Sequence, residues 1–281
     1  MNGNLLKLYQ RNDRIVLSLS IFQAALILTA AVLSLMHQDT YASESGTWQL
    51  QSIGQDLINS IFIVPVLLTC TVYTLRNNKT AFFIWGGIHL YLLYTFIIYA
   101  FNIHFNNFFL LYCVVLGISF YSLLWYAYRM VLIYMQSAID YRYPQKLLAV
   151  YLIMIGSFFI SLWLSEIIPA MFQHTHPQIL EETGLFTNPV QVLDLSVVLP
   201  GFILTGVLLL RGKRAGYLLT PSLLAFMVLM NITIASLSIF MEYKQLEYSG
   251  ALASNMGLLA IISALLLKRH LKSLTTPNEP E

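Results

Sequence analysis

Residues 188–214 read NPVQVLDLSVVLPGFILTGVLLLRGKR and contain the pattern that decides the fold of this chain. Asn188 and Pro189 are typical of a helix start, because asparagine can accept from a free backbone N–H and proline fits the first helical position. About 20 mostly apolar residues follow, long enough to cross the roughly 30 Å of hydrocarbon in a bilayer. The basic residues Arg211, Lys213 and Arg214 then close the segment. This segment therefore predicts a transmembrane helix that ends on the cytoplasmic side.

The same pattern recurs along the chain and predicts an all-α membrane protein, a bundle of eight transmembrane helices. Of the 281 residues, 58% are hydrophobic and 10% are charged, whereas soluble domains carry about 25% charged residues. This composition excludes a soluble globular protein, and a formal net charge of +2 gives no indication of a nucleic-acid partner. Ser52, with Gln55 at the third position after it, predicts the start of the second helix. The eight expected spans are 15–36, 53–75, 80–101, 108–130, 146–168, 189–210, 216–240 and 250–268.

The positive charges predict the orientation of the bundle. With the N-terminus in the cytoplasm, 14 of the 15 Lys and Arg residues fall on the inner side and only Lys244 falls outside. We therefore expect both termini to be cytoplasmic. The longest outer loops, 37–52 and 169–188, are too short for a soluble domain, and 176–184 predicts one short surface helix.

An internal repeat is predicted when the chain is aligned with itself, without gaps, so that Pro65 meets Pro200. At this offset Arg76 meets Arg211, and Asn59 meets Asp194. The pattern suggests two parallel four-helix halves, 1–145 and 146–281, related by an axis along the membrane normal. Apolar helices also match by chance, so a coincidental similarity remains the alternative. A binding site in a duplicated protein is expected between the halves.

Ionisable and amide side chains inside the spans are the candidate ligand-binding groups, because burying them is costly. Asn59 lies one turn deeper than Asp56, and Gln191 lies one turn before Asp194. The alternative is that these carboxylates only stabilise the positive ends of helix dipoles. We expect Asp56 and Asp194 to face a shared polar cavity. The candidates from this pattern are Asp56, Asn59, Glu166, Gln191 and Asp194.

His89 and Tyr91 complete the candidate ligand-binding set, since they lie near mid-depth in the third span. A lone histidine or tyrosine there can equally be a hydrogen-bonded packing residue. His174 and His176 form an H-x-H pattern that is a weak candidate for a metal site, and loop histidines are usually solvated. No motif points to a catalytic residue or a cofactor.

The run from Asn188 to Tyr217 resembles a segment of a group of bacterial multi-span membrane proteins that has no assigned activity. A looser similarity covers FNIHFNNFFLLY, residues 101–112. The resemblance implies a bacterial cytoplasmic membrane and nothing catalytic. The first hypothesis is binding or transport of a small molecule or ion through an outward-facing polar vestibule. The alternatives are a structural or accessory membrane protein, or a subunit of a membrane redox or metal enzyme; the sequence does not indicate the oligomeric state.

Overall fold

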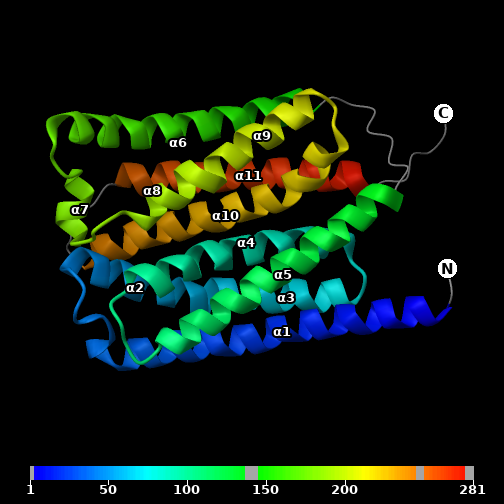
Figure 1. Cartoon of the computed structure of the whole chain (residues 1–281), viewed down its shortest axis with the longest axis horizontal. Coiled ribbons are helices and arrows are strands. Elements are labelled where there is room, and N and C mark those ends of the chain that lie inside the picture. Colours follow the sequence, from blue (N-terminus) through cyan, green and yellow to red (C-terminus); the bar gives the residue numbers. More distant parts are fainter. Residues whose placement is uncertain (1–2, 137–144, 245–249, 276–281) are drawn as a thin grey trace.

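The structure, a computed structural model, describes residues 3–136, 145–244 and 250–275, and within these ranges every regular element is helical (Figure 1). Eight helices there are long and apolar enough to span a membrane, as the hydropathy predicts. Two of these spans are each built from two α-helices joined by a π-helical turn. The elements of the eight spans are α1 Gly3–Met36, α2 Gly46–Ile58 with α3 Val64–Leu75, α4 Lys79–Asn102, α5 Phe109–Gln136, α6 Lys146–Gln173, α8 Pro189–Leu193 with α9 Leu199–Leu210, α10 Arg214–Tyr243 and α11 Gly250–Thr275.

The predicted start of the second span at Ser52 is wrong. The helix begins at Gly46, where the Ser45 hydroxyl accepts from the backbone N–H of Trp48 at 3.4 Å. Ser52 lies inside the helix and donates to the Trp48 carbonyl at 2.9 Å. The polar sequence before residue 53 is helical because Trp48 and Ser52 are buried on one face of it.

Two further predictions, the helix cap at Asn188 and the short helix before it, are confirmed. Asn188 caps α8, since its side chain accepts from the N–H groups of Val190 at 2.9 Å and Gln191 at 3.3 Å. The short surface helix is α7, Gln178–Thr183, which ends at Gly184 with a φ of 70°. Such a left-handed residue is a common helix terminator, and glycine adopts it without steric cost.

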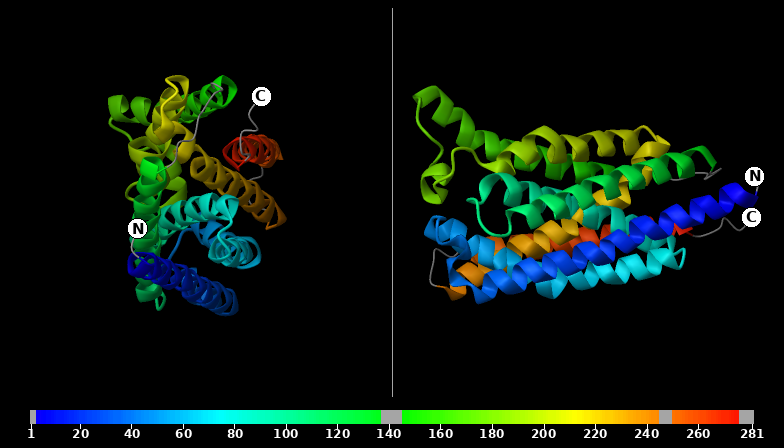
Figure 2. Two further views of the ribbon diagram at one scale, coloured as in Figure 1. Left: turned by 90° about the vertical axis from the view of Figure 1, so that its right-hand side faces the viewer. Right: turned by 60° about the horizontal axis from the view of Figure 1, so that its bottom comes forward.

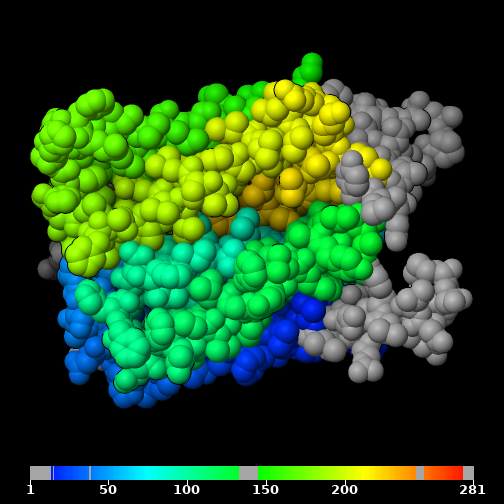
Figure 3. Space-filling model, in the orientation of Figure 1, coloured from blue at the N-terminus to red at the C-terminus, as the bar shows by residue number. Residues whose placement is uncertain are grey.

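The spanning helices run roughly along the long axis of the molecule (Figures 1 and 2). The start of α1 and the end of α11 lie at one end, which we call the terminal end. The helix α7 and the short turn η1, Gln38–Tyr41, lie at the opposite end. Figure 3 shows α4 and α5 below α8 and α9, with part of α10 visible between them and α6 beyond α9 at the upper edge.

Small residues set the closest helix approaches, as is usual for helices in a membrane. A Cβ atom added to Gly87 of α4 would lie 2.6 Å from the Cβ of Ala225 and 2.6 Å from the carbonyl oxygen of Ser222, both in α10. A Cβ atom on Gly206 of α9 would lie 2.7 Å from the carbonyl oxygen of Ala149 in α6. The backbones of α4 and α10 therefore meet directly at residue 87.

A π-helical turn interrupts two of the spans just before a proline. In the first, Asn59–Ile63, the N–H of Val64 donates to the carbonyl of Asn59. In the second, Asp194–Val198, the N–H of Leu199 donates to the carbonyl of Asp194. Pro65 and Pro200 follow and lack the N–H that would continue the ladder, so the wider turns accommodate the change in hydrogen bonding.

Several local features recur at the offset that aligns Pro65 with Pro200. The π-helical turns start at residues 59 and 194, and the α-helices after them span 64–75 and 199–210. The turns that follow each contain one residue in the left-handed region, Asn77 and Gly212, both with a φ of 62°. The next helices start at residues 79 and 214. Residues 87 and 222, which meet where α4 crosses α10, are related by the same offset.

We expect Gly87→Ala to lower the free energy of unfolding by about 1–3 kcal/mol, the typical cost of overpacking. The added methyl group would meet both the Ala225 side chain and the Ser222 backbone, and a backbone cannot rotate away. Thermal unfolding of the purified protein in detergent measures the effect. Gly117→Ala is the matched control, since nothing lies within 4 Å of a Cβ there; it is expected to be neutral or stabilising. Equal melting temperatures for the two variants would contradict the close crossing.

Candidate functional site

Asp56 is a buried carboxylate held by three hydroxyl groups. Its side chain is in α2 and the residue is 3% exposed. Oδ2 accepts from the Tyr41 hydroxyl at 2.6 Å and from the Ser34 hydroxyl, and Oδ1 accepts from the Tyr99 hydroxyl at 2.8 Å. Hydrogen bonds to a carboxylate are stronger than those between neutral groups, so they offset part of the cost of burial. All four residues belong to the first half of the chain.

The Tyr41 hydroxyl is kept protonated by its surroundings. Burial, followed by the negative charge of Asp56, raises the pKa of Tyr41 well above its usual value. The hydroxyl group therefore remains a donor to Asp56 over the physiological pH range. Its oxygen also lies 3.4 Å from the hydroxyl oxygen of Tyr112, which extends the network into α5.

Asp194 joins the two halves of the chain. Its Oδ1 accepts from the hydroxyl of Tyr94 in α4 at 3.1 Å, and its Oδ2 accepts from the indole N–H of Trp163 in α6 at 2.9 Å. It begins the second π-helical turn. The carboxylate thus connects the span built from α8 and α9 to α4 and to α6.

Asn59 and Tyr91 lie together in a third polar group. The Gln55 amide donates to the Tyr91 hydroxyl at 2.7 Å and to Oδ1 of Asn59 at 3.0 Å. The Tyr91 hydroxyl also lies 3.0 Å from the hydroxyl of Thr233 in α10. This group therefore connects α2 and α4 with the second half.

A cavity of about 260 Å³ lies between the halves, near the opposite end, and these three polar groups approach it. Tyr99, Tyr94 and Gln55 line it, and they bond to Asp56, Asp194 and Tyr91 respectively. Neither carboxylate is itself among the lining residues, so each reaches the cavity through one tyrosine. The cavity is lined by Trp48, Gln51, Ser52, Gln55, Tyr94, Thr95, Ile98, Tyr99, Ile103, Val190, Met230, Thr233, Ile234, Leu237, Ser238, Met241 and Leu252.

Trp48 supplies a spare donor in this wall. Its indole nitrogen is buried and has no hydrogen-bond partner among the described residues. A buried N–H without a partner costs free energy that an acceptor on a bound molecule would recover. The remaining wall is mostly aliphatic, as in most small-molecule sites.

The structure places Glu166 and Gln191 elsewhere. Oε2 of Glu166 accepts from the Gln191 amide at 3.1 Å, and Oε1 accepts from the backbone N–H of Ile179 at 3.4 Å. These bonds connect the end of α6 and the start of α8 to the surface helix α7. Gln191 lines a separate, mainly apolar pocket between these helices.

His89 is also outside the cavity between the halves. The histidine is fully buried and packs against Trp85, with ring centroids 3.9 Å apart and ring planes tilted by 41°. Its Nδ1 lies 3.0 Å from the Trp85 carbonyl oxygen, and its Nε2 lies 3.4 Å from the Ser20 hydroxyl. Ser20 belongs to α1, so these contacts fit a hydrogen-bonded packing residue.

No group of three or more His, Cys, Asp or Glu side chains suited to a metal is present in the described ranges. His174 ends α6 in the left-handed conformation with a φ of 53°. The histidine close to a carboxylate is instead His104, whose Nδ1 lies 3.0 Å from Glu44 Oε2. Its backbone N–H donates to Glu44 Oε1 at 2.7 Å.

Sequence reasoning missed the donors that surround the carboxylates. Ser34, Tyr41 and Trp163 come from other helices or loops, and nothing in their spacing relates them to Asp56 or Asp194. The many tyrosines of the third and fourth spans were the one available signal, because a tyrosine hydroxyl inside a membrane needs a partner. Their periodicity fits packing equally well.

We expect Asp56→Leu to lower the free energy of unfolding by more than about 3 kcal/mol, because three buried hydroxyl groups lose an acceptor at about 1 kcal/mol or more each. Asp56→Asn keeps one acceptor oxygen and offers its amide to a hydroxyl that can rotate, so less than half of that loss is expected. Chemical denaturation in detergent gives both values. Asp39→Leu is the control, since Asp39 is exposed. A similar loss for the Asn and Leu variants would show that the acceptor oxygens are unimportant.

Comparison with known proteins shows no matching family model, no matching curated protein and no matching solved structure.

Proposed function

We propose that this protein is an integral membrane protein that binds a small, mostly apolar, neutral or cationic molecule in the cavity between its halves. The observation that carries the proposal is that two tyrosines of the cavity wall each donate to a carboxylate behind them, Tyr99 to the buried Asp56 and Tyr94 to the half-buried Asp194. Packing alone does not require a carboxylate behind each tyrosine. The wall thus combines apolar area with a negative electrostatic potential.

The preference of the cavity for a cation over an anion follows from the residues in and behind its wall. Asp56 and Asp194 lie directly behind the wall, and no Lys or Arg is among its described lining residues. A charge acts over a longer distance in a region of low dielectric constant, so a cation in the cavity is favoured over an anion. The rings of Trp48 and Tyr94 also suit a cation. The Trp48 N–H favours a molecule that carries an acceptor as well.

The duplication predicted from the sequence forms part of the proposal. It is supported by the π-helical turns, the left-handed residues and the helix starts that recur at one constant offset. It is further supported by the contact of residues 87 and 222, because equivalent residues meet each other on a twofold axis. On this basis the cavity lies in the interface of halves 1–145 and 146–281 but off the axis.

The orientation is proposed from the charges. Arg76, Lys79, Arg211 and Lys213 lie in turns or helix starts at the terminal end, which fits a cytoplasmic location for that end. Arg142, one of the counted residues, lies outside the described residues. The cavity then opens toward the outer side of a cytoplasmic membrane, which the resemblance of residues 188–217 suggests is bacterial.

A labelling experiment tests the orientation. Ser43 at the opposite end and Lys213 at the terminal end are both exposed. In a variant without Cys70 and Cys113, a cysteine at position 43 is expected to react with an impermeant thiol reagent in whole cells. A cysteine at position 213 is expected to react only after the membrane is permeabilised. The reverse pattern would invert the proposed topology.

Binding is tested with three single-ring probes of similar size: 2-phenylethylammonium, 2-phenylacetamide and phenylacetate. The melting temperature of the detergent-purified full chain is expected to rise most with the cation, less with the amide and not with the anion. Asp194→Asn removes one negative charge, and its amide can still donate to the Tyr94 hydroxyl, so the variant is expected to fold. Its preference for the cation over the amide is expected to fall about tenfold, which corresponds to about 1.4 kcal/mol.

Glu182→Gln is the matched control, since Glu182 is exposed on α7 and is not among the residues that line the cavity. It is expected to bind all three probes as the unmodified chain does. If no probe shifts the melting temperature, or if Asp194→Asn binds them unchanged, Asp56 and Asp194 serve only packing. The alternative of a structural or accessory membrane protein would then be favoured.

A further inference from the structure

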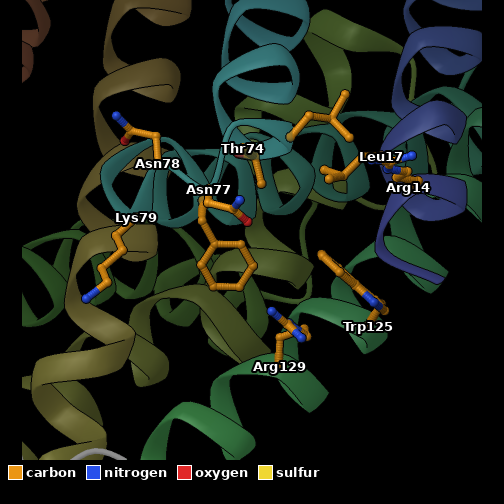
Figure 4. A pocket seen from close by; sticks show the side chains of 10 residues that line it. Arg14, Leu17, Thr74, Asn77, Asn78, Lys79, Trp125 and Arg129 are labelled. Atoms are coloured by element: carbon orange, nitrogen blue, oxygen red, sulfur yellow. The ribbon is translucent and has the colours of Figure 1, made fainter. Parts of the chain in front are cut away.

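A second cavity, of about 350 Å³, lies at the terminal end of the first half between α1, α3, α4 and α5 (Figure 4). Three basic residues line it, each from a different helix: Arg14, Lys79 and Arg129. No acidic side chain is among its described lining residues. The cavity therefore gathers positive charge at the depth where a bilayer presents its polar headgroups.

Thr74 contributes a hydroxyl without a partner. The residue is 9% exposed, and its Oγ1 makes no hydrogen bond to any described residue. Figure 4 shows its side chain directed into the space between Arg129, Trp125 and Asn77. A buried hydroxyl that lacks a partner is costly, and rotation of the Thr74 side chain toward an acceptor oxygen in the cavity would recover this cost.

Asn77 is a second polar residue that lines the cavity, and asparagine is common at such a helix-ending turn. It has a φ of 62°, a conformation that glycine adopts most easily. The corresponding position in the second half is Gly212, with the same φ of 62°. The first half thus accepts a less favourable residue at this turn, and the carboxamide it gains lies at the cavity.

The second half packs differently at the corresponding place. Phe82 lines the cavity, and Tyr217 occupies the equivalent position of the second half. His270 stacks on Tyr217 with ring centroids 6.3 Å apart, and its Nε2 lies 2.8 Å from the Tyr217 carbonyl oxygen. Its Nδ1 lies 2.5 Å from the Gln145 side-chain oxygen. The first half thus places basic side chains and Phe82 where the second half packs His270 against Tyr217.

From this geometry we propose that the cavity at the terminal end binds a phosphate ester. Arginine recognises phosphate oxygens with paired N–H donors, and Thr74 and Asn77 add neutral donors. Leu17, Phe82 and Trp125 supply an apolar side that suits the carbon chain next to the phosphate. The phosphate can belong to an anionic lipid headgroup or to a soluble ester, since the donors recognise the same group in both. The inference does not depend on the cavity between the halves.

The test uses the full-length protein in nanodiscs of dioleoylphosphatidylcholine. One arm replaces part of this lipid with dioleoylphosphatidylglycerol, and the other adds glycerol 1-phosphate or inorganic phosphate to the buffer. We expect a rise in melting temperature that saturates with the concentration of the probe. A rise with the anionic lipid alone identifies a headgroup site, and a rise with the soluble probes identifies a site for a soluble phosphate.

Three variants decide whether the effect belongs to this cavity. Arg129→Gln and Asn77→Gly are each expected to weaken binding about tenfold, the consequence of losing one strong hydrogen bond. Thr74→Val removes the hydroxyl at nearly constant shape. It is expected to keep or raise the melting temperature without probe while weakening binding several-fold. A purely structural role for Thr74 would not separate these two readouts.

Arg211→Gln is the matched control, because Arg211 is an exposed arginine at the end of α9 and does not line the cavity. It is expected to bind the probes as the unmodified chain does. The proposal is overturned if no probe raises the melting temperature. It is equally overturned if the control and the three variants bind alike, since the effect would then be a general attraction of anions to the basic end of the bundle.

Discussion

Gly87 lets the backbones of α4 and α10 come into direct contact, and the remaining architecture is arranged around this crossing. In a bilayer the hydrophobic effect does not press helices together, so close van der Waals packing has to do so. Near the crossing, the Ser222 hydroxyl lies 2.5 Å from the Tyr126 hydroxyl and donates to the Phe83 carbonyl at 3.2 Å. The crossing therefore positions α4, and with it the tyrosines that reach both carboxylates.

The two carboxylates illustrate two ways of keeping a charge inside the bundle. Asp56 is enclosed by donors from its own half, and Asp194 is held by one donor from each half. Under the proposed repeat, Asp56 corresponds to Gln191, and Asp194 corresponds to Asn59. Each half thus has one acidic and one amide side chain at these positions, in opposite order. The acidic residues consequently lie at different depths and in different environments.

The number of spans, their approximate ranges and the cap at Asn188 could be predicted because they depend on local sequence. Hydropathy over about 20 residues and a cap one turn long need no knowledge of distant contacts. The start of the second span was misplaced because residues 46–52 are polar and become helical by burying Trp48 against distant parts of the chain. The candidate residues Asp56, Asn59, Tyr91 and Asp194 do contribute to the polar groups around one cavity, whereas His89, Glu166 and Gln191 lie elsewhere.

The sequence by itself determined that the chain forms eight helices long and apolar enough to span a membrane, because a backbone in lipid must satisfy its polar groups within each helix. It also showed that carboxylates lie inside the predicted spans and that two of these spans contain a proline at equivalent positions, 65 and 200. The tertiary structure alone decided which hydroxyl and indole groups meet those carboxylates, and that basic side chains line a cavity at one terminal-end turn while His270 packs against Tyr217 at its counterpart. The reason is that both outcomes depend on side chains from helices far apart in sequence, whose rotation and depth are set only when the helices pack.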